Sequence, residues 1–314
     1  MTGLVAICVC TMDRPQQLRQ LLRALGRLDA PGPGHREIVI VVDNSSDATA
    51  RAVVDEAAAS APERYRYAHE PRRGLAFARN RALGEAMLAR ADLIAFIDDD
   101  EMPRPGWLGG LIEALETRDA AAAIGPVEPV FEAPPPRWLP LAAYALERSP
   151  AADGCVREGY TSNAILRAAA VREHQLRFDE RLNASGGEDT EFFMQLLRAG
   201  GRIAWAPAAL VHEYVPRSRM TVAWLWRRWY RIAVVEAWLR TRGQNGATGT
   251  LFSLARGLAR VVAGTGRVGV ALVTWAPRRP DMVIASFFTL CRGLGYIASA
   301  LGTRADHYAS KRYR

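Results

Sequence analysis

The sequence has little lysine, little cysteine and no long apolar run. Its 41 basic residues include a single lysine, Lys311, which we attribute to genomic composition bias. Four scattered cysteines in 314 residues exclude a disulfide scaffold, and none has the paired spacing of a zinc site. No uninterrupted apolar segment reaches about 18 residues, so no clear membrane span is predicted. The N-terminus lacks the basic region and cleavage site of a signal peptide.

Several nucleotide-binding and catalytic motifs are also missing. There is no GxxxxGK[ST] loop, which excludes a P-loop NTPase. No GxGxxG follows the first apolar run, so a dinucleotide-binding Rossmann enzyme is not expected. The GxSxG elbow of serine hydrolases is absent as well.

Charge is distributed unevenly along the chain. Residues 215–314 hold 17 Lys+Arg and 3 Asp+Glu, whereas residues 1–214 hold 24 basic and 30 acidic residues. The two parts of the chain therefore face partners of different charge. The length itself suggests about two domains.

Strand and helix patterns alternate over the first two thirds of the chain. Apolar, β-branched runs at Leu4–Cys10, Glu37–Asp43 and Asp92–Asp98 predict three buried strands, and leucines at helical spacing after Pro15 predict a helix between the first two. This alternation predicts an α/β fold with a mostly parallel sheet flanked by helices. Ligands bind at the carboxyl ends of such strands. Further elements are predicted at 48–60 (helix), 65–68 (strand), 74–90 (loop, then helix), 188–199 (helix) and 202–206 (strand).

Three consecutive aspartates, Asp98, Asp99 and Asp100, follow the third buried strand. Like charges so close together repel one another, and a divalent cation relieves that repulsion. Oxygen ligands suit Mg²⁺ or Mn²⁺, which keep positions open for substrate phosphates. The alternative is a solvated acidic turn before Pro103.

A second acidic motif, Gly186–Phe193, reads GGEDTEFF and places Glu188 and Asp189 in a first helical turn. There carboxylates also favour the helix dipole, so an ordinary acidic helix start is the alternative to a catalytic carboxylate. His212, in LVHEYVP, is isolated. A lone histidine is more often structural, although imidazole is a common metal ligand.

Taken in order, these motifs resemble family 2 glycosyltransferases with the GT-A fold. The resemblance is carried by CTMDRPQQLRQLLRAL, VVDNSSD, RRGLAFARNRAL, FIDDDEMPRPGWL and GGEDTEFFMQLLRAGGRIAWAP. It spans residues 6–212, with Asp13 where the family usually has Asn. The C-terminal part looks most like bacterial exopolysaccharide enzymes of the succinoglycan-biosynthesis type.

The resemblance implies roles for individual residues. Asp189 would be the catalytic base, and Glu188 would orient a sugar. The implied nucleotide contacts are Thr11, Asp13, Arg14, Asp43, Arg79, Asp98 and Asp99. The implied metal ligands are Asp100, Asp98 and His212. The implied acceptor or sugar contacts, several of them in GYTSNAILR, are Thr161, Ser162, Asn163 and Gly187.

The activity implied is an inverting, metal-dependent transfer of one hexose from a UDP-sugar, with UDP-glucose as a candidate. Mn²⁺ or Mg²⁺ would stabilise the departing diphosphate. The acceptor would be a hydroxyl of a lipid-linked saccharide, on a polyprenyl diphosphate, in exopolysaccharide biosynthesis. Processive members carry QxxRW, but Leu225 stands here where Gln would fall, which favours one transfer per encounter.

We expect a catalytic domain over residues 1–215 and a basic, tryptophan-rich helical region over 216–314. Trp224–Arg240 predicts a helix lying in the headgroup layer, with its tryptophans at the interface. Two apolar stretches split by Arg292 predict a helical hairpin after it. The protein would then lie on the cytoplasmic membrane face as a peripheral or monotopic protein. The alternatives are a structural subdomain here and, for the whole chain, an anionic-polymer or nucleic-acid binder or an inactive scaffold of the same fold. We favour no nucleic-acid partner, because the best motifs lie in the acidic part.

Overall fold

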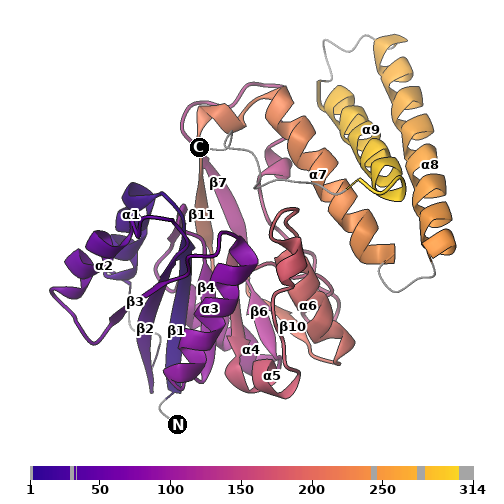
Figure 1. The fold of residues 1–314 in the computed structure, drawn as a ribbon. Helices are drawn as coiled ribbons and strands as arrows, with labels where there is room; N and C mark the ends of the chain where they lie inside the picture. The colour runs from indigo at the N-terminus through magenta and orange to yellow at the C-terminus, as the bar shows by residue number, and fades with distance from the viewer. Residues whose placement is uncertain (1–2, 29–31, 33, 242–245, 274–279, 304–314) are drawn as a thin grey trace. The chain divides into compact units, whose positions relative to one another are not determined.

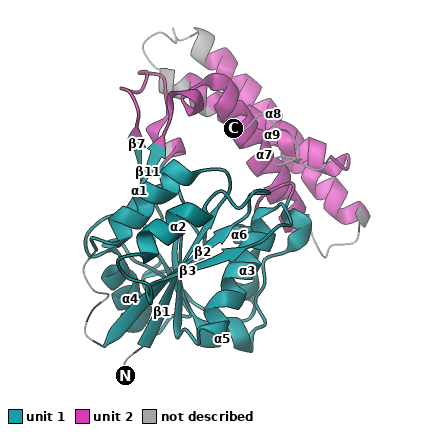
Figure 2. Cartoon of the chain, turned by 60° about the vertical axis from the view of Figure 1, so that its left-hand side comes forward, with its two compact units in different colours: residues 1–130, 145–183, 188–214 teal, residues 131–144, 184–187, 215–314 magenta. Residues whose placement is uncertain are grey.

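The computed structural model describes residues 3–28, 32, 34–241, 246–273 and 280–303. The chain divides into two compact units, coloured separately in Figure 2. Unit 1 comprises residues 1–130, 145–183 and 188–214, and unit 2 comprises residues 131–144, 184–187 and 215–314. Unit 2 thus includes two short segments outside the C-terminal region expected at 216–314.

Unit 1 is built on an eight-stranded, mostly parallel sheet flanked by helices (Figure 1). The three apolar runs seen in the sequence form neighbouring central strands, because their side chains are buried on both faces. In sheet order the strands are β3 Tyr65–His69, β2 His35–Asp43, β1 Gly3–Thr11, β4 Leu93–Ile97, β9 Asn163–Arg167, β6 Ala122–Ile124, β10 Ile203–Trp205 and β8 Cys155–Val156. The predicted α/β fold class is confirmed.

Strand β9 was not expected from the sequence, which looked irregular there. It lies between β4 and β6 and runs antiparallel to both. A smaller second sheet has the order β5-β11-β7, formed by β5 Glu101–Pro103, β11 Val211–Val215 and β7 Val127–Phe131. It follows directly from the turn that carries the three aspartates.

The helices of unit 1 follow the strands in the expected alternation. Helix α1 begins at Pro15, whose fixed φ suits a first helical turn, and buries Leu18, Leu21, Leu22 and Leu25. The helices are α1 Pro15–Leu25, α2 Arg51–Ala58, α3 Leu75–Leu88, α4 Trp107–Thr117, α5 Ala168–Glu173 and α6 Glu188–Arg198. Parallel register pairs Thr11 with Asp43, so β1 and β2 end at the same edge of the sheet.

Unit 2 holds the long helices α7 Val222–Thr241, α8 Gly246–Val273 and α9 Pro280–Ala300. Helix α9 packs against both α7 and α8. Glycines make these approaches close. A Cβ at Gly293 would lie 2.8 Å from the carbonyl oxygen of Gly257, and one at Gly295 would lie 2.6 Å from the Cβ of Ala233.

Three tryptophans of α7, Trp224, Trp226 and Trp229, pack inside unit 2, contrary to the expectation that they lie at a membrane interface. Trp224 stacks on Tyr144 with ring centroids 5.4 Å apart, and Trp229 lies edge-on to Phe288 at 4.8 Å. Trp226 also packs against this aromatic cluster. These three tryptophans therefore belong to the core of unit 2, because burying their rings together removes more apolar surface from water than exposing one side would.

Arg292 does not divide the last apolar stretches into a hairpin, which corrects that prediction. It lies within the single helix α9 and forms an ion pair with Glu236 of α7, which also accepts a hydrogen bond from the hydroxyl of Tyr296 at 2.8 Å. Burial would raise the pKa of Glu236, but Arg292 and Tyr296 hold it below its usual value. The arginine is tolerated because it is paired. Among the described residues, no helix is apolar enough over a sufficient length to cross a bilayer.

We predict that Gly293→Ala lowers the free energy of unfolding by about 1–3 kcal/mol, because the added methyl group overpacks the contact with α8. The matched control is Gly266→Ala in α8, where a Cβ would meet nothing within 4 Å. That substitution should instead raise stability by about 0.5–1 kcal/mol through helix propensity. Thermal unfolding of the two variants measures both effects. Equal shifts of the same sign would contradict glycine-mediated packing.

Candidate functional site

The turn that follows β4 is anchored by a buried aspartate. Asp99 is 4% exposed, and its carboxylate accepts hydrogen bonds from the Thr11 hydroxyl at 2.7 Å and from Arg14 at 2.9 Å. Burial raises the pKa of Asp99 to about 6, partly opposed by Arg14. Asp99 thus ties the end of β4 to the end of β1. The carboxylate of Asp99 faces Thr11 and Arg14 within the protein. A direct contact between Asp99 and a nucleotide stays a prediction.

The two flanking aspartates are placed differently. Arg14 also contacts Asp100 at 3.2 Å, and the side chain of Asp100 is 16% exposed. Asp98 keeps 42% of its side-chain surface exposed. The surrounding protein nevertheless raises the pKa of Asp98, since Arg79 only partly offsets burial and the repulsion from Asp100 and Asp189. The turn therefore presents two carboxylates and hides the third.

Arg79 of α3 joins two parts of the site that are distant in sequence. Its guanidinium is buried at 4% exposure, forms an ion pair with Glu188 and lies 3.6 Å from Asp98. Burial alone would lower the pKa of Arg79, but Glu188 and Asp98 raise it above its ordinary value. The ring of Phe178 lies 5.7 Å from the same guanidinium. Arg79 thus holds the start of α6 against the turn after β4.

Asp189 follows Glu188 in the first turn of α6 and is partly exposed, whereas Glu188 is buried. One carboxylate oxygen of Asp189 accepts a hydrogen bond from the Thr190 backbone N–H at 2.6 Å. Repulsion from Asp189 also raises the pKa of Asp98, which places both acids in one electrostatic environment. The pair predicted from GGEDTEFF is therefore split, with one carboxylate locked by Arg79 and the other accessible.

Glu101 is a site residue that the sequence analysis missed. It directly follows the three aspartates, is 1% exposed, and accepts the backbone N–H of Asp98 at 2.8 Å. Burial, followed by repulsion from Asp98, raises its pKa well above the usual range. Glu101 thus fixes the backbone of the turn through its hydrogen bond with Asp98. The only signal in the sequence was a fourth consecutive acid.

Hydrogen bonds to Asp43 also fix the loop at the end of β2. Asp43 is fully buried and accepts from the backbone N–H groups of Ser45 and Ala50 at 2.9 and 2.8 Å and from the Tyr67 hydroxyl at 3.2 Å. This carboxylate organises the loop after β2. Its contact with a nucleotide stays a prediction.

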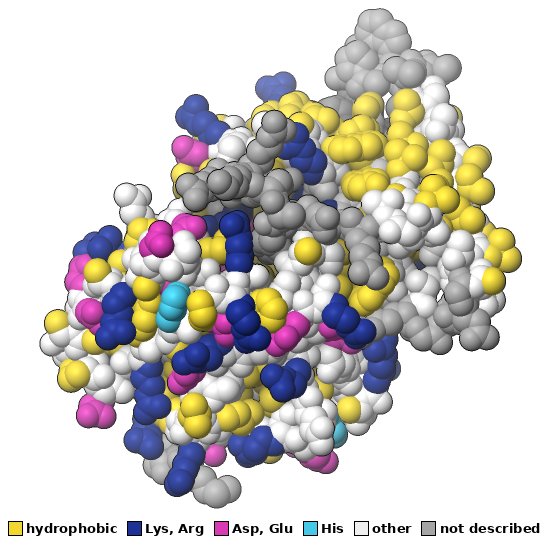
Figure 3. Space-filling view, viewed as in Figure 1, with side chains coloured by type: hydrophobic (Ala, Val, Ile, Leu, Met, Phe, Trp, Pro, Cys, Tyr) yellow, Lys and Arg dark blue, Asp and Glu magenta, His cyan; other side chains and the backbone are white. Residues whose placement is uncertain are grey.

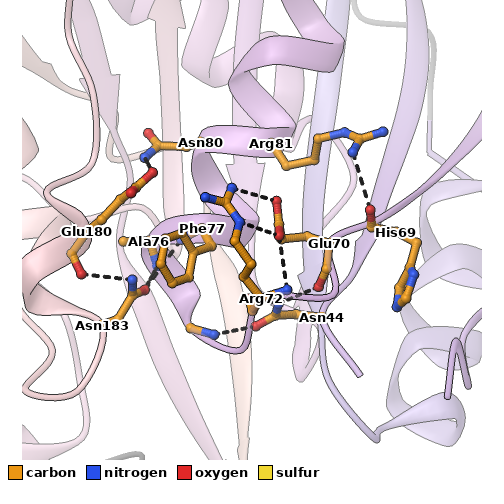
Figure 4. Close-up of polar contacts among 11 residues, drawn as sticks. Asn44, His69, Glu70, Arg72, Ala76, Phe77, Asn80, Arg81, Glu180 and Asn183 are labelled. Atoms are coloured by element: carbon orange, nitrogen blue, oxygen red, sulfur yellow. Dashed lines mark hydrogen bonds and ion pairs between the residues drawn. The ribbon is translucent and has the colours of Figure 1, made fainter. Parts of the chain in front are cut away.

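Next to it, Asn44 and Asn183 hold the start of α3, as Figure 4 shows. Asn44 accepts the N–H of Gly74 at 2.9 Å, and Asn183 accepts the N–H of Ala76 at 2.8 Å. Gly74 has φ 150°, and a Cβ there would lie 2.3 Å from the Asn183 side chain. Only glycine fits this position, and the helix that carries Arg79 begins from it.

Asp13 adopts a left-handed backbone conformation, with φ 57°. Asn and Asp tolerate that region better than other non-glycine residues, which accounts for Asp at a position where the resembled family has Asn. Asp13 is exposed in the loop after β1. Its contact with a nucleotide stays a prediction.

The structure corrects the expectation for Asn163 as a sugar contact. Its side chain is fully buried, accepts the indole N–H of Trp107 at 2.8 Å and donates to the carbonyls of Pro126 and Ala209 at 2.9 and 2.6 Å. These three hydrogen bonds join β9 to the segments that carry Trp107, Pro126 and Ala209. Asn163 is a structural residue.

Its neighbours differ in exposure. Thr161 is fully buried, and its hydroxyl has no hydrogen-bond partner among the described residues, whereas Ser162 is partly exposed. Gly187 has φ 85°, and a Cβ there would lie 2.3 Å from Val235 Cγ1. The backbone conformation and the close contact with Val235 thus explain why glycine stands at position 187. Of the four predicted sugar contacts, Ser162 is the side chain that remains accessible.

His212 lies on β11, and its Nε2 is 3.8 Å from Glu128. Within the described ranges, no group of three or more His, Cys, Asp or Glu side chains is arranged to hold a metal ion. The expected set of Asp98, Asp100 and His212 is therefore not a protein-only metal site. Two carboxylates still suit Mg²⁺ or Mn²⁺, since these ions commonly combine one or two carboxylates with substrate phosphates.

We predict that Arg79→Met destabilises unit 1 by about 3–5 kcal/mol, because it removes the buried cation that pairs with the buried carboxylate of Glu188. The double variant Arg79→Met/Glu188→Gln should recover part of that loss. Denaturant unfolding of the two single variants and the double variant gives the coupling energy. Additive losses in this cycle would show that the pair is not coupled.

A further prediction concerns Asn163. Asn163→Ala should lower the free energy of unfolding by about 3 kcal/mol or more, since a buried indole N–H and two carbonyls lose their partner at about 1–3 kcal/mol each. Ser162→Ala, one residue away and partly exposed, is the matched control and should change stability little. Similar losses in both variants would argue against the structural role of Asn163.

Comparison with known proteins agrees with this architecture. The Glycosyl transferase family 2 domain matches residues 6–175, and Glycosyl transferase family group 2 matches residues 93–298. The chain is 40% identical over 227 residues to the succinoglycan biosynthesis protein ExoM of Rhizobium meliloti (strain 1021), covering 72% of each chain.

Two solved structures share the fold over nearly the whole chain. Mannosyltransferase PcManGT from Pyrobaculum calidifontis, in complex with GDP-Man and Mn²⁺, has a TM-score of 0.60 at 19% identity, over 95% of this chain and 88% of that one. S. aureus TarS 1-349, in complex with UDP-GlcNAc, has a TM-score of 0.52 at 15% identity, over 98% and 93%. On the family match and the identity to ExoM, the chain belongs to glycosyl transferase family 2 and is a glycosyltransferase.

Proposed function

We propose that the protein is an inverting, non-processive enzyme that transfers a hexose from a UDP-sugar to a hydroxyl of a lipid-linked saccharide in exopolysaccharide biosynthesis. The observation that carries the proposal is the arrangement around Arg79. This buried arginine brings the turn with Asp98 and Asp100 together with the helix start that carries Asp189. One edge of the sheet therefore combines the two accessible carboxylates of the turn, proposed to face the diphosphate, with the partly exposed Asp189.

The donor is proposed to bind at the carboxyl ends of β1, β2 and β4, where ligands bind in open α/β sheets. Strands β1 and β2 end there in register, at Thr11 and Asp43. PcManGT was solved with GDP-Man and TarS with UDP-GlcNAc, which supports a nucleotide sugar as the class of donor. Within that class we favour UDP-glucose.

Asp98 and Asp100 are proposed as the residues that would hold a divalent cation, Mn²⁺ or Mg²⁺, when the donor binds. Asp98 offers an exposed carboxylate and Asp100 a partly exposed one. When bound, the cation would neutralise the charge that develops on the departing diphosphate. The residues themselves contribute negative oxygen ligands, and Arg14 and Arg79 fix their positions.

Asp189 is proposed as the general base. It takes the proton of the acceptor hydroxyl as that oxygen attacks the anomeric carbon, and the nucleoside diphosphate leaves from the opposite face. A direct displacement of this kind needs one carboxylate base and inverts the anomeric centre. Glu188 is held by Arg79, so we assign it to positioning Asp189 and the sugar.

The acceptor is proposed to be a saccharide on a polyprenyl diphosphate at the cytoplasmic membrane face. The similarity to ExoM, named for succinoglycan biosynthesis, supports a polysaccharide pathway. We propose residues 1–215 as the catalytic domain and residues 216–314 as the region that associates peripherally with the membrane. The excess of 17 basic over 3 acidic residues in the last hundred supports that assignment.

Asp189→Asn should retain donor binding and lose transfer by a factor of about 10²–10⁴, as expected when a general base is removed. The variant keeps the shape of the side chain, so the start of α6 should be unaffected. Titration calorimetry with UDP measures binding, and turnover of a UDP-sugar panel measures transfer. Asp55→Asn, at an exposed aspartate of α2, is the control. Near-normal turnover of Asp189→Asn would move the base elsewhere.

Asp100→Ala should abolish the metal-dependent part of UDP affinity while unit 1 stays folded. Wild-type protein treated with EDTA should behave like the variant, and added Mn²⁺ should restore affinity in the wild type alone. Asp55→Ala serves as the exposed control. If EDTA leaves wild-type affinity for UDP unchanged, the proposed cation site is wrong.

A further inference from the structure

Three helices of unit 2 bring charged side chains together around one buried tyrosine. Tyr296 of α9 is fully buried, and its hydroxyl donates a hydrogen bond to Glu236 of α7 at 2.8 Å. The guanidinium groups of Arg256 and Arg260 of α8 lie 5.9 and 4.4 Å from the centroid of the same ring. Residues four positions apart share one face of a helix, so both arginines belong to the side of α8 that meets α9.

Glu236 holds two further arginines of this cluster. Arg292 of α9 forms an ion pair with it, and the Nε of Arg240 lies 3.1 Å from its carboxylate. Four guanidinium groups therefore lie around a single carboxylate, which leaves an excess of three positive charges. Helix α8 contains no acidic residue, and Figure 3 shows no acidic side chain on the visible face of α8 and α9. The cluster is therefore strongly positive.

Two nitrogen atoms inside the cluster have no acceptor among the described residues. The Nη1 of Arg260 and the Nε of Arg292 are both shielded from solvent, and neither finds a hydrogen-bond partner there. The face of the Tyr296 ring attracts the Arg260 cation, but a ring supplies no lone pair for an N–H donor. Buried donors are almost always paired in folded proteins because leaving one unpaired is costly. The two nitrogens therefore indicate an acceptor that comes from outside these helices.

We propose that the unit 2 arginine cluster, formed by Arg240, Arg256, Arg260 and Arg292, binds a phosphate or diphosphate group. Such an anion offers several acceptor oxygens to donors on different guanidinium groups and carries enough charge to offset the excess. A carboxylate ligand would offset only one charge. The side chains of Arg240 and Arg292 are 49% and 26% exposed, so the cluster is reached from solvent on one side.

A lipid-linked diphosphate, an anionic phospholipid headgroup and a free phosphate all share this chemistry. We expect the diphosphate of a lipid-linked saccharide, and that choice of source alone rests on the proposed function. The cluster is formed by residues of unit 2, whereas the carboxylates proposed to face the donor belong to unit 1. The proposal thus adds a second phosphate-binding site, and it assigns that site to the acceptor.

Titration calorimetry of the full chain with inorganic pyrophosphate in EDTA tests the site. EDTA leaves the carboxylates of the turn after β4 without a cation, so they repel the probe. Wild-type protein should bind pyrophosphate, and Arg260→Gln should lower the affinity by about ten-fold or more, because a charge-assisted hydrogen bond is lost. Arg267→Gln, at an exposed arginine of the same helix, removes an equal charge and should bind like the wild type. If Arg260→Gln fails to fold, Arg256→Gln, at an exposed arginine of the cluster, takes its place.

Flotation with phosphatidylcholine vesicles identifies the source of the phosphate. The vesicles contain either a polyprenyl diphosphate or phosphatidylglycerol. Binding that depends on Arg260 and requires the polyprenyl diphosphate supports the acceptor as ligand. Equal binding to phosphatidylglycerol assigns the site to a phospholipid headgroup, and binding of pyrophosphate without either vesicle assigns it to a soluble phosphate.

Two outcomes would overturn the proposal. One is wild-type protein that binds neither pyrophosphate nor either kind of vesicle. The other is an equal loss of affinity in Arg260→Gln and Arg267→Gln, which would show attraction by overall charge rather than by a site. Mn²⁺-dependent binding of UDP to the wild type tests the proposed function separately, because it depends on the carboxylates of unit 1.

Discussion

Carboxylates gathered at one edge of a sheet repel each other, and in unit 1 two arginines make that arrangement tolerable. Arg79 is buried between Glu188 and Asp98, and Arg14 bridges Asp99 and Asp100. Removing such a partner leaves a charge in a poorly solvated place, which costs far more than an exposed ion pair is worth. The positions of the turn after β4 and of the start of α6 both depend on these two side chains. The geometry of this edge of the sheet therefore depends on buried pairing rather than on surface charge.

Much of the unit 1 fold was predictable because its central strands are buried on both faces. Strands β1, β2 and β4 each contain a continuous run of buried apolar residues, and such a short run bounded by polar turns is typical of a buried strand. Strand β9 escaped because its antiparallel place between β4 and β6 depends on partners far away in sequence. Asn163 was misjudged for the same reason, since a polar residue after GYTS looks like a ligand contact until its three buried partners are known.

At the site, residue type predicted which side chains gather but not which way they face. Three successive aspartates predict a charged turn. Only the fold shows that Asp99 points toward Thr11 while Asp98 stays partly exposed. The roles of Glu101 and Arg79 likewise depend on burial, which a single sequence does not reveal at one position. Arg79 was expected to face a nucleotide, and its described partners are the acids of the site itself. Arg79 therefore connects the turn after β4 with the start of α6.

In unit 2, too, sequence composition does not show which side of a helix is buried, as α7 and α8 illustrate. Helix α7 is rich in tryptophan and arginine, which in sequence resembles an interfacial helix, but its rings contact Tyr144, Phe287 and Phe288. Helix α8, by contrast, contains many small residues and few charged ones. Glycines bring α8 and α9 close on one side, whereas Leu251, Leu258 and Val262 of α8 are exposed. Which face of each helix stays exposed thus follows from where the core of unit 2 takes its contacts, and composition alone does not show this.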